Sequence, residues 1–163
     1  MRTSRLMITG LVLMTQLHAY AQDDKKEKDI ANSEAVKSMV ESKRYVFEAD
    51  KASPMKGGIK HLDPGYTLTI TPETIISDLP FFGQVNQPSM NPSDSGYKFS
   101  STDFEYTTAN RKKGGWDIKI KIKDVKYSPQ VSLTIFENGS TSVRISSNDR
   151  DSISFDGEIK EYK

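Results

Sequence analysis

The sequence predicts a single, mostly β (α+β) domain: an antiparallel meander sheet of about eight strands, curved or barrel-like, with one N-terminal helix. Three observations predict it. Apolar residues recur at every second position in several short segments, and glycine, proline and asparagine separate these segments. Apolar residues at helical spacing occur once, near the N-terminus. Because helices do not alternate with the strands, we expect antiparallel pairing rather than βαβ units.

The first 21 residues have the three parts of a cleavable export signal. Arg2 and Arg5 form a basic start, Leu6–Leu17 form an apolar stretch, and an Ala-Tyr-Ala ending supplies the small residues of a cleavage site. The apolar stretch is about 12 residues long, whereas a membrane-spanning helix needs about 20. We therefore expect cleavage between Ala21 and Gln22. The mature chain is expected to be periplasmic or secreted, with no membrane span.

Signal cleavage leaves a nearly neutral chain without cysteine. Residues 1–21 contain two arginines and no acidic residue, so their loss changes the formal charge from +1 to −1. This balance provides no overall attraction to nucleic acid or anionic lipid. The lack of cysteine excludes disulfides, lipid attachment at a junction cysteine and thiol catalysis. Only His61 remains after cleavage, which excludes multi-histidine metal sites. We expect no cofactor and no metal.

The expected domain, residues 31–163, follows a charged linker. Residues 22–30 contain little that a fold can bury, so we expect them to be disordered. The domain then opens with a short helix, since apolar residues recur three or four positions apart. Its stripe comprises Ile30, Val36, Met39, Val40 and Lys43. Asn32 or Ser33 is expected to cap it. Because so short a helix is marginal alone, it should pack on the sheet or across one end.

Alternation predicts the strands, and turn residues predict their ends. The clearest alternation is Trp116–Lys123, with isoleucines on one face and lysines on the other, as a half-buried antiparallel strand requires. Phe99 and Phe104 fall on opposite parities, so a turn or bulge near 101–103 separates two strands. Gly157 is expected at a bulge or turn of the last strand. The other expected strands are 45–49, 66–71, 74–79, 97–101, 104–108, 131–136, 141–146 and 153–159.

One hairpin can be assigned a register. A two-residue turn at the Asn-Gly pair would set Leu133 opposite Arg144 and mix the apolar and polar faces. A three-residue loop, 137–139, sets Leu133 opposite Val143 instead. It also puts Gly139 at the left-handed position of a bulge, where glycine is favoured. Because a one-residue slip reverses every side chain, we predict the three-residue loop.

Aromatic and charged loop residues are the candidate ligand-binding residues. Phe81 and Phe82 follow a proline and open a long turn-rich segment, where they could form a binding patch with Gln84. The alternative is that one ring closes the end of the core. Arg150 lies in a charged turn and could hold an anionic ligand by its guanidinium fork. The alternative for Arg150 is local pairing with an acid or a carbonyl group.

Two further patterns bear on catalysis and charge. Asp103 and Glu105 would lie about 7 Å apart on one strand face, within the range used by glycosidases, so a carboxylate-dependent hydrolase stays open. Lys119, Lys121 and Lys123 form a one-sided row, which suits either an anionic partner or a solvated face.

Four short motifs occur in the same order as in a known family. They are Leu79-Pro80-Phe81-Phe82-Gly83, Gly96-Tyr97-Lys98-Phe99, Gly114-Gly115-Trp116-Asp117-Ile118 and Arg150-Asp151-Ser152-Ile153-Ser154-Phe155-Asp156-Gly157. Over about residues 33–160 the chain resembles the domain-of-unknown-function family 4251, small exported proteins typical of Bacteroidota. The resemblance implies export and a single domain, and it implies no activity. The family prefers Tyr and Arg near the segment where this chain has Phe81, Phe82 and Gln84, which reduces polar contacts there.

These observations favour an exported, non-enzymatic binding or accessory module. We expect a small-molecule or envelope-protein ligand and no nucleic-acid partner. A carboxylate-dependent hydrolase and a purely structural envelope component are the alternatives. A pocket with two converging acids would favour the hydrolase, an aromatic-rimmed cavity would favour the binding module, and the lack of both would favour the structural component.

Overall fold

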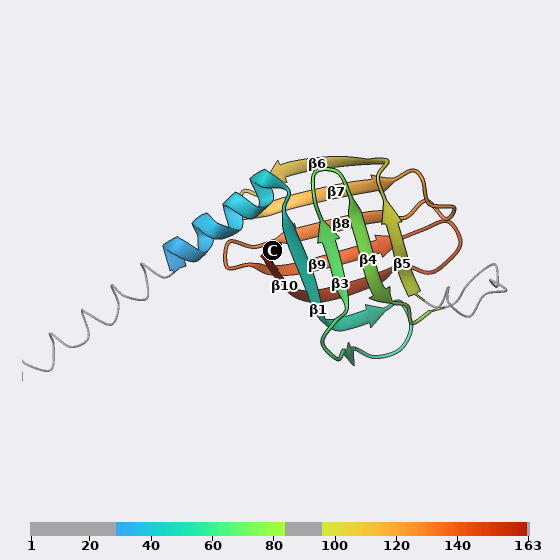
Figure 1. The fold of residues 1–163 in the computed structure, drawn as a ribbon. Helices are drawn as coiled ribbons and strands as arrows, with labels where there is room; N and C mark the ends of the chain where they lie inside the picture. Colours follow the sequence, from blue (N-terminus) through green and yellow to red (C-terminus); the bar gives the residue numbers. More distant parts are fainter. Residues whose placement is uncertain (1–28, 84–95, 163) are drawn as a thin grey trace, which may run out of the picture.

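The computed structural model describes residues 29–83 and 96–162. The export signal and Gln84 lie outside these residues. The described part contains one helix, residues 29–42, followed by ten strands (Figure 1). The strands are β1 (Tyr45–Pro54), β2 (Lys60–His61), β3 (Thr67–Ile70), β4 (Ile75–Pro80), β5 (Gly96–Ser101), β6 (Phe104–Asn110), β7 (Trp116–Ile122), β8 (Gln130–Ile135), β9 (Ser140–Ser146) and β10 (Ile153–Glu161).

The strands form one antiparallel sheet in the order β5-β4-β3-β1-β10-β9-β8-β7-β6. The sheet returns on itself because the first strand pairs with the last, from Tyr45 opposite Glu161 to Pro54 opposite Ile153. In Figure 1, β6–β10 cross behind β1, β3, β4 and β5. Among the described strands, a seam without pairing separates β5 from β6. The predicted barrel-like, mostly β meander is confirmed.

A tight turn connects β5 to β6 across this seam. The carboxylate of Asp124 accepts hydrogen bonds from the Ser101 hydroxyl and from the backbone N–H groups of Thr102 and Asp103. These bonds, that of Ser101 first, lower the pKa of Asp124. The turn predicted between the two strands is therefore confirmed, and Asp124 is the residue that holds it.

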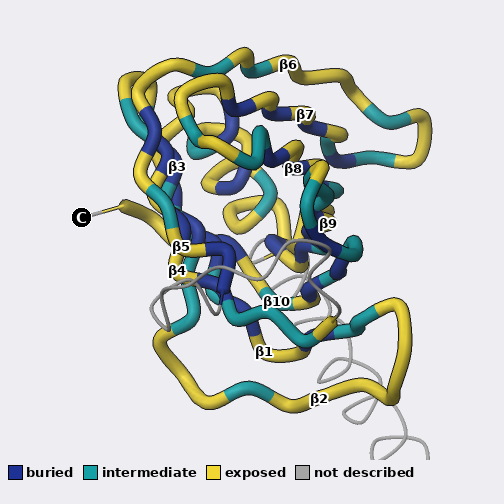
Figure 2. Tube along the Cα trace, turned by 90° about the vertical axis from the view of Figure 1, so that its right-hand side faces the viewer, coloured by how far each residue is buried: buried dark blue, intermediate teal, exposed yellow. Residues whose placement is uncertain are grey.

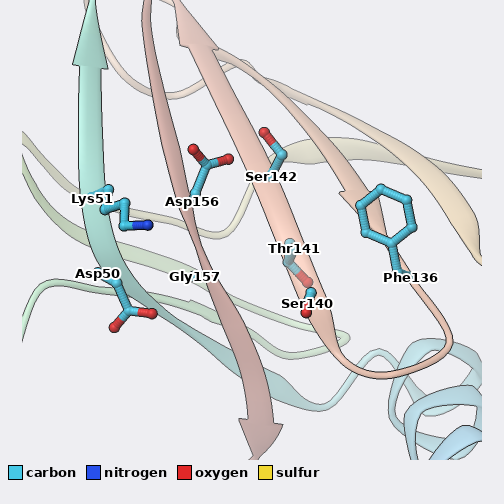
Figure 3. A pocket seen from close by; sticks show the side chains of 8 residues that line it. All are labelled: Asp50, Lys51, Phe136, Ser140, Thr141, Ser142, Asp156 and Gly157. Atoms are coloured by element: carbon cyan, nitrogen blue, oxygen red, sulfur yellow. The ribbon is translucent and has the colours of Figure 1, made fainter. Parts of the chain in front are cut away.

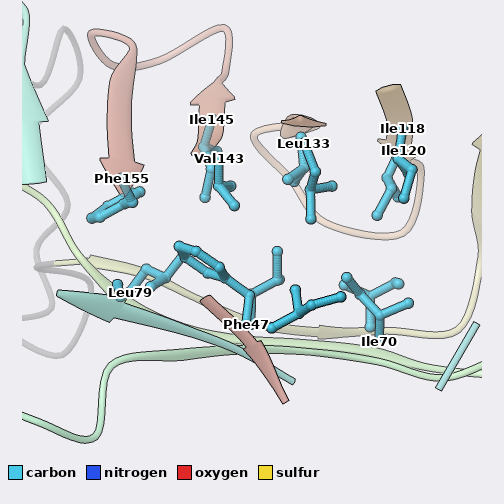
Figure 4. Close-up of a cluster of buried hydrophobic side chains, with 14 of the residues drawn as sticks. Phe47, Ile70, Leu79, Ile118, Ile120, Leu133, Val143, Ile145 and Phe155 are labelled. Carbon is cyan, nitrogen blue, oxygen red and sulfur yellow. The ribbon is translucent and has the colours of Figure 1, made fainter. Parts of the chain in front are cut away.

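Alternating side chains fill the interior of the barrel. In β7, Ile118, Ile120 and Ile122 are buried, while the residues between them are exposed. Figure 4 shows Phe47, Ile70 and Leu79 facing the apolar side chains of β7–β10 across the core. The tube in Figure 2 shows buried and exposed positions alternating along β7. Since large apolar side chains occupy this space, the centre is a packed core.

The β8–β9 hairpin has the predicted three-residue loop. Leu133 pairs with Val143. The Phe136 N–H donates to the Ser140 carbonyl oxygen at 2.9 Å, which closes the loop. Gly139 has a φ of 86°, the left-handed conformation that glycine adopts at low cost. Polar and apolar faces therefore separate as expected.

The helix starts earlier than predicted. Residues 29–31 are already helical, so Asn32 and Ser33 lie inside the helix and the predicted cap is wrong. The Asn32 side-chain amide instead donates to the Asn138 carbonyl oxygen at 3.1 Å, which ties the helix to the β8–β9 loop. Ile30 is 52% exposed, because the first turn projects beyond the end of the barrel (Figure 1). The helix packs at one end, where Val36 and Val40 of its later turns are buried.

β1 and β2 extend beyond the predictions. Alternation predicted a strand that ends at Ala49, but β1 continues past a register shift between Ala49 and Lys51. β2 contains only Lys60 and His61, which is too short to show alternation, and it pairs with β1. With β2 included, the described sheet has ten strands rather than about eight.

Candidate functional site

Arg150 lies in the turn between β9 and β10, against three aromatic rings. Its guanidinium carbon is 5.5 Å from the ring centroid of Phe81, 5.3 Å from that of Tyr97 and 4.7 Å from that of Tyr127. The ring of Phe81 meets that of Tyr97 edge-on, with centroids 5.6 Å apart. A cation held over aromatic faces is stabilised by their quadrupoles. We call these four residues the Arg150 cluster.

The guanidinium of Arg150 is paired within the protein. Its Nε and Nη2 each donate to a carboxylate oxygen of Asp149 at 3.2 Å, and its Nη1 donates to the Gly96 carbonyl oxygen at 2.9 Å. Burial raises the pKa of Asp149, but hydrogen bonds from Arg150 and Ser147 outweigh that effect, so the pKa is lowered. The side chain of Arg150 is only 4% exposed. The structure shows local pairing, and the ligand-binding role of Arg150 stays a prediction.

The two neighbouring phenylalanines have different surroundings. Phe81 is half-buried and packs against the core through Tyr97, as the alternative of a core-closing ring requires. Phe82 is also half-buried, and the Lys60 ammonium lies 5.2 Å from its ring centroid. The structure therefore brings Phe81 to Arg150 and Phe82 to the β2 lysine, while Gln84 lies outside the described residues.

The carboxylates considered for catalysis do not share a strand face. Asp103 lies in the turn before β6, so its predicted place on a strand with Glu105 is wrong. Lys123 lies 2.8 Å from the Glu105 carboxylate, and this hydrogen bond lowers the pKa of Glu105. A general acid needs a raised pKa. The shift at Glu105 runs in the opposite direction.

A groove crosses the outer face of β9, β10 and β1 (Figure 3). It originates in a β-bulge of β1. Ala49 pairs with Gly157 and Lys51 pairs with Asp156, so Asp50 is the extra residue between them. As a result, Asp50 and Lys51 are both exposed, although they are consecutive. Bulges redirect side chains in this way.

Gly157 allows the close approach of strands beneath the groove. A Cβ added at this position would stand 2.0 Å from the Glu48 carbonyl oxygen of β1. Glycine is therefore the residue that fits the observed spacing of the two strands. The bulge predicted in the last strand at Gly157 lies instead in the partner strand β1, opposite Gly157, and β10 is continuous there. Side chains from three strands and the β8–β9 loop then surround a hollow of about 270 Å³, namely Asp50, Lys51, Asp156, Ser140 and Ser142 from the strands and Phe136 from the loop.

The charged groups of the groove have no partners in the part of the chain that the structure describes. Among the described residues, the side chains of Asp50, Lys51 and Asp156 make no ion pair or hydrogen bond. Farther along the same two strands, Lys160 pairs with both Glu48 and Glu158. Ion pairs thus form elsewhere on this face, but the charged groups of the groove form none among the described residues.

The groove belongs to a longer cross-strand row of polar residues. Strand pairing aligns His61, Lys51, Asp156, Ser142, Thr134 and Asp117, from β2 to β7. At the far end, the Thr134 hydroxyl donates to Asp117 at 2.9 Å, and Arg111 lies 3.5 Å from the same carboxylate. The row is therefore paired at β7 and β8 and open at β1, β9 and β10.

Phe136 forms one wall of the groove. Its side chain is 44% exposed, and the Arg111 guanidinium carbon lies 4.9 Å from its ring centroid. Phe136 and Ser140 also line a second hollow of about 360 Å³ beside Glu137 and Asn138. The two hollows thus meet at one exposed aromatic ring.

The sequence analysis missed this groove. The available signal is the break in alternation between Ala49 and Ala52, which are buried three positions apart with two polar residues between them. That spacing indicates one extra residue on the outer face. The residues that face Asp50 and Lys51 across the groove come from β9 and β10, about 90 or more positions later in the chain, and only strand pairing identifies them.

The described residues lack a metal-binding cluster and a membrane-spanning helix. They contain no group of three or more histidine, aspartate or glutamate side chains placed to hold a metal ion. The helix they contain is too short and polar to cross a membrane.

Comparisons with known proteins agree with this architecture. A search of curated proteins finds no match. A crystal structure of a DUF4251 family protein from Bacteroides eggerthii has a TM-score of 0.62 and 13% identity, over 80% of this chain and 88% of that chain. At this identity the likeness shows the fold alone. The model of the family described as a domain of unknown function (DUF4251) matches residues 27–159. The chain therefore belongs to the DUF4251 family, as its motif order indicated.

Proposed function

We propose that this protein is an exported, non-enzymatic binding module, and that the groove over β1, β9 and β10 is its ligand surface. One observation carries the proposal. Asp50, Lys51 and Asp156 face one hollow, and among the described residues their side chains have no ion-pair or hydrogen-bond partner. Binding sites hold a few convergent polar groups that a ligand satisfies. In the Arg150 cluster, by contrast, Asp149 and Gly96 already occupy the guanidinium.

The chemistry of the lining defines the ligand class. Two carboxylates accept hydrogen bonds, one ammonium donates them, and the hydroxyls of Ser140 and Ser142 do both. The exposed ring of Phe136 adds an apolar contact at one side. We infer a small polar ligand that carries both donors and acceptors, bound across the strands.

Two acids, Asp50 and Asp156, line this hollow, which is the feature that would favour the hydrolase, but both side chains are exposed. A catalytic acid is usually kept protonated by burial, so the surface supports the hydrolase less than the binding module. A serine nucleophile is also unsupported. His61 and Ser142 lie in the same cross-strand row but three strand spacings apart, about 14 Å at the usual interstrand distance. A nucleophile and its base must lie within hydrogen-bond reach. The described geometry therefore favours binding at the groove.

Export is the second part of the proposal, and it rests on the pattern of residues 1–21. Expression of the full chain in a Gram-negative host, followed by fractionation and intact mass measurement, tests it. We expect a periplasmic product that begins at Gln22. A cytoplasmic, full-length product would contradict export and leave the groove proposal standing.

Native mass spectrometry of the periplasmic product tests the groove. We expect a noncovalent adduct on the wild-type chain that is lost in the double variant K51Q/D156N. The matched control is K119Q, because Lys119 is exposed on β7 and lies outside the groove. An adduct retained by K51Q/D156N would place the ligand elsewhere, and a bare wild-type chain would contradict binding.

A further inference from the structure

A hairpin arm projects from the sheet where β1 passes into β2. We define the arm as residues 54–61. Its tip carries Met55 and Ile59, which are 65% and 68% exposed and are the most exposed large apolar residues in the described part of the chain. Figure 2 shows the loop around β2 standing away from the barrel, exposed over most of its length.

The two glycines at the tip lie in open space among the described residues. A Cβ added at Gly57 or at Gly58 would meet nothing within 4 Å. Large apolar side chains on a solvated tip are unfavourable unless something covers them. The arm therefore leaves Met55 and Ile59 exposed to solvent, where a partner can contact them.

Basic residues flank these apolar side chains. The arm carries Lys56 and Lys60 and no acidic residue, and Lys51 lies at its base, paired in register with His61. The nearest acids in the chain, Asp50 and Asp63, also lie at the base. Although the total charge of the chain is close to zero, the arm itself is basic and carries exposed apolar side chains.

The arm is held in place before any partner arrives. Ala52 pairs with Lys60, and the Leu62 N–H donates to the Asp50 carbonyl oxygen at 2.9 Å. The Lys60 ammonium also lies over the Phe82 ring. Because the base is fixed by these contacts, binding would order few further residues.

We propose that this arm docks the protein on an anionic membrane surface. Met55 and Ile59 enter the headgroup boundary, and Lys56 and Lys60 meet the lipid phosphates. Shallow apolar insertion combined with basic residues is the chemistry of peripheral membrane binding. Each lysine near an anionic surface contributes about 1 kcal/mol, a roughly fivefold increase in binding. The proposal is independent of the groove, which faces outward from β1, β9 and β10.

Vesicle sedimentation tests the proposal. The chain from Gln22 onward, which retains every described residue, is mixed with vesicles of phosphatidylcholine alone or with added phosphatidylglycerol. We expect binding to the anionic vesicles only, lost when salt rises from about 0.1 to 1 M and the Debye length shortens from about 10 to 3 Å. K56Q/K60Q should lower the partition coefficient roughly 30-fold. M55S/I59S should lower it by more than about 30-fold.

Matched variants separate the arm from general charge and apolarity. K119Q/K121Q removes two exposed lysines of β7, and I76S removes an exposed apolar side chain of β4 that is 47% exposed. Both should bind as the wild type does, and all variants should keep the wild-type circular dichroism spectrum. Three results would overturn the proposal: no binding to anionic vesicles, equal binding to neutral vesicles, or equal loss in the controls. Self-association abolished by M55S/I59S without vesicle binding would also overturn it, since the arm would then contact a second copy.

Discussion

The Arg150 cluster and the groove both gather charged and aromatic side chains, but they treat their charges differently. At the cluster, Arg150 is surrounded by three rings and donates to Asp149 and Gly96. In the groove, Asp50, Lys51 and Asp156 are exposed and make no such bonds among the described residues. A buried charge without a partner is costly, whereas an exposed charge is stabilised by water.

This difference separates a stabilising role from a binding role. Satisfied groups hold the fold together and offer few free donors or acceptors. Unsatisfied groups around a hollow contribute little to stability and remain available to a ligand. Substitutions at the two regions should therefore have opposite consequences: a large loss of stability at the cluster and a loss of binding at the groove.

The largest effect is expected for R150A. It removes the charge-assisted bonds to Asp149 and the contacts with the rings, and it leaves Asp149 without its main partner. We expect the free energy of unfolding in urea to fall by about 3 kcal/mol. R144A, at an exposed arginine of β9, is the control and should change it by less than about 0.5 kcal/mol. A stable R150A that loses a bound ligand would reverse the roles assigned to the two regions.

The next effect concerns the floor of the groove. G157A adds a methyl group where the Glu48 carbonyl oxygen stands 2.0 Å away, so β1 and β10 must separate. We expect a loss of about 2 kcal/mol in the free energy of unfolding, from overpacking. G58A is the matched control, since a Cβ at Gly58 meets nothing. If the two variants unfold at the same urea concentration, the close approach does not hold the bulge in place.

Local patterns predicted most of the fold. The isoleucines of β7 and the register around Gly139 follow from alternation and from the conformational preference of glycine, which neighbouring residues determine. The predicted cap failed at Asn32, whose side chain bonds to Asn138, more than a hundred residues later, instead of capping the helix. Barrel closure was expected only in outline, and the pairing of β1 with β10 places the seam.

The candidate site was less predictable than the fold. Phe81 and Arg150 were identified from their residue types, but the contact between them forms across the barrel end. Asp50 and Lys51 have no unusual local sequence apart from the interrupted alternation. Their significance depends on Asp156 and Ser142, which long-range pairing brings beside them. A site whose residues come from several strands gives only a weak pattern in the sequence of any one strand.

A smaller effect should appear in the pH dependence of stability. Hydrogen bonds from Arg150 and Ser147 hold the pKa of Asp149 below its ordinary value of 3.8. A carboxylate with a lowered folded-state pKa adds stability above its ordinary pKa and loses it as the pH falls through the folded value. We expect the free energy of unfolding to decrease below about pH 4. The decrease should be shallower in D149N. It should not vanish, because the pKa values of Glu105 and Asp124 are also lowered. If the free energy of unfolding falls equally steeply with pH in wild type and D149N, Asp149 does not contribute to the pH dependence.

The smallest effect on stability is expected for K51Q/D156N. Both side chains are exposed and lack partners among the described residues, so their removal breaks no ion pair or hydrogen bond. The free energy of unfolding should stay within about 0.5 kcal/mol of the wild-type value, in urea titrations without ligand. A loss of more than about 1 kcal/mol would show that Lys51 and Asp156 stabilise each other across the strands in solution. The groove would then be an internally satisfied surface like the Arg150 cluster. If the free energy of unfolding is unchanged and the adduct is lost, these charges contribute to ligand binding and not to the stability of the fold.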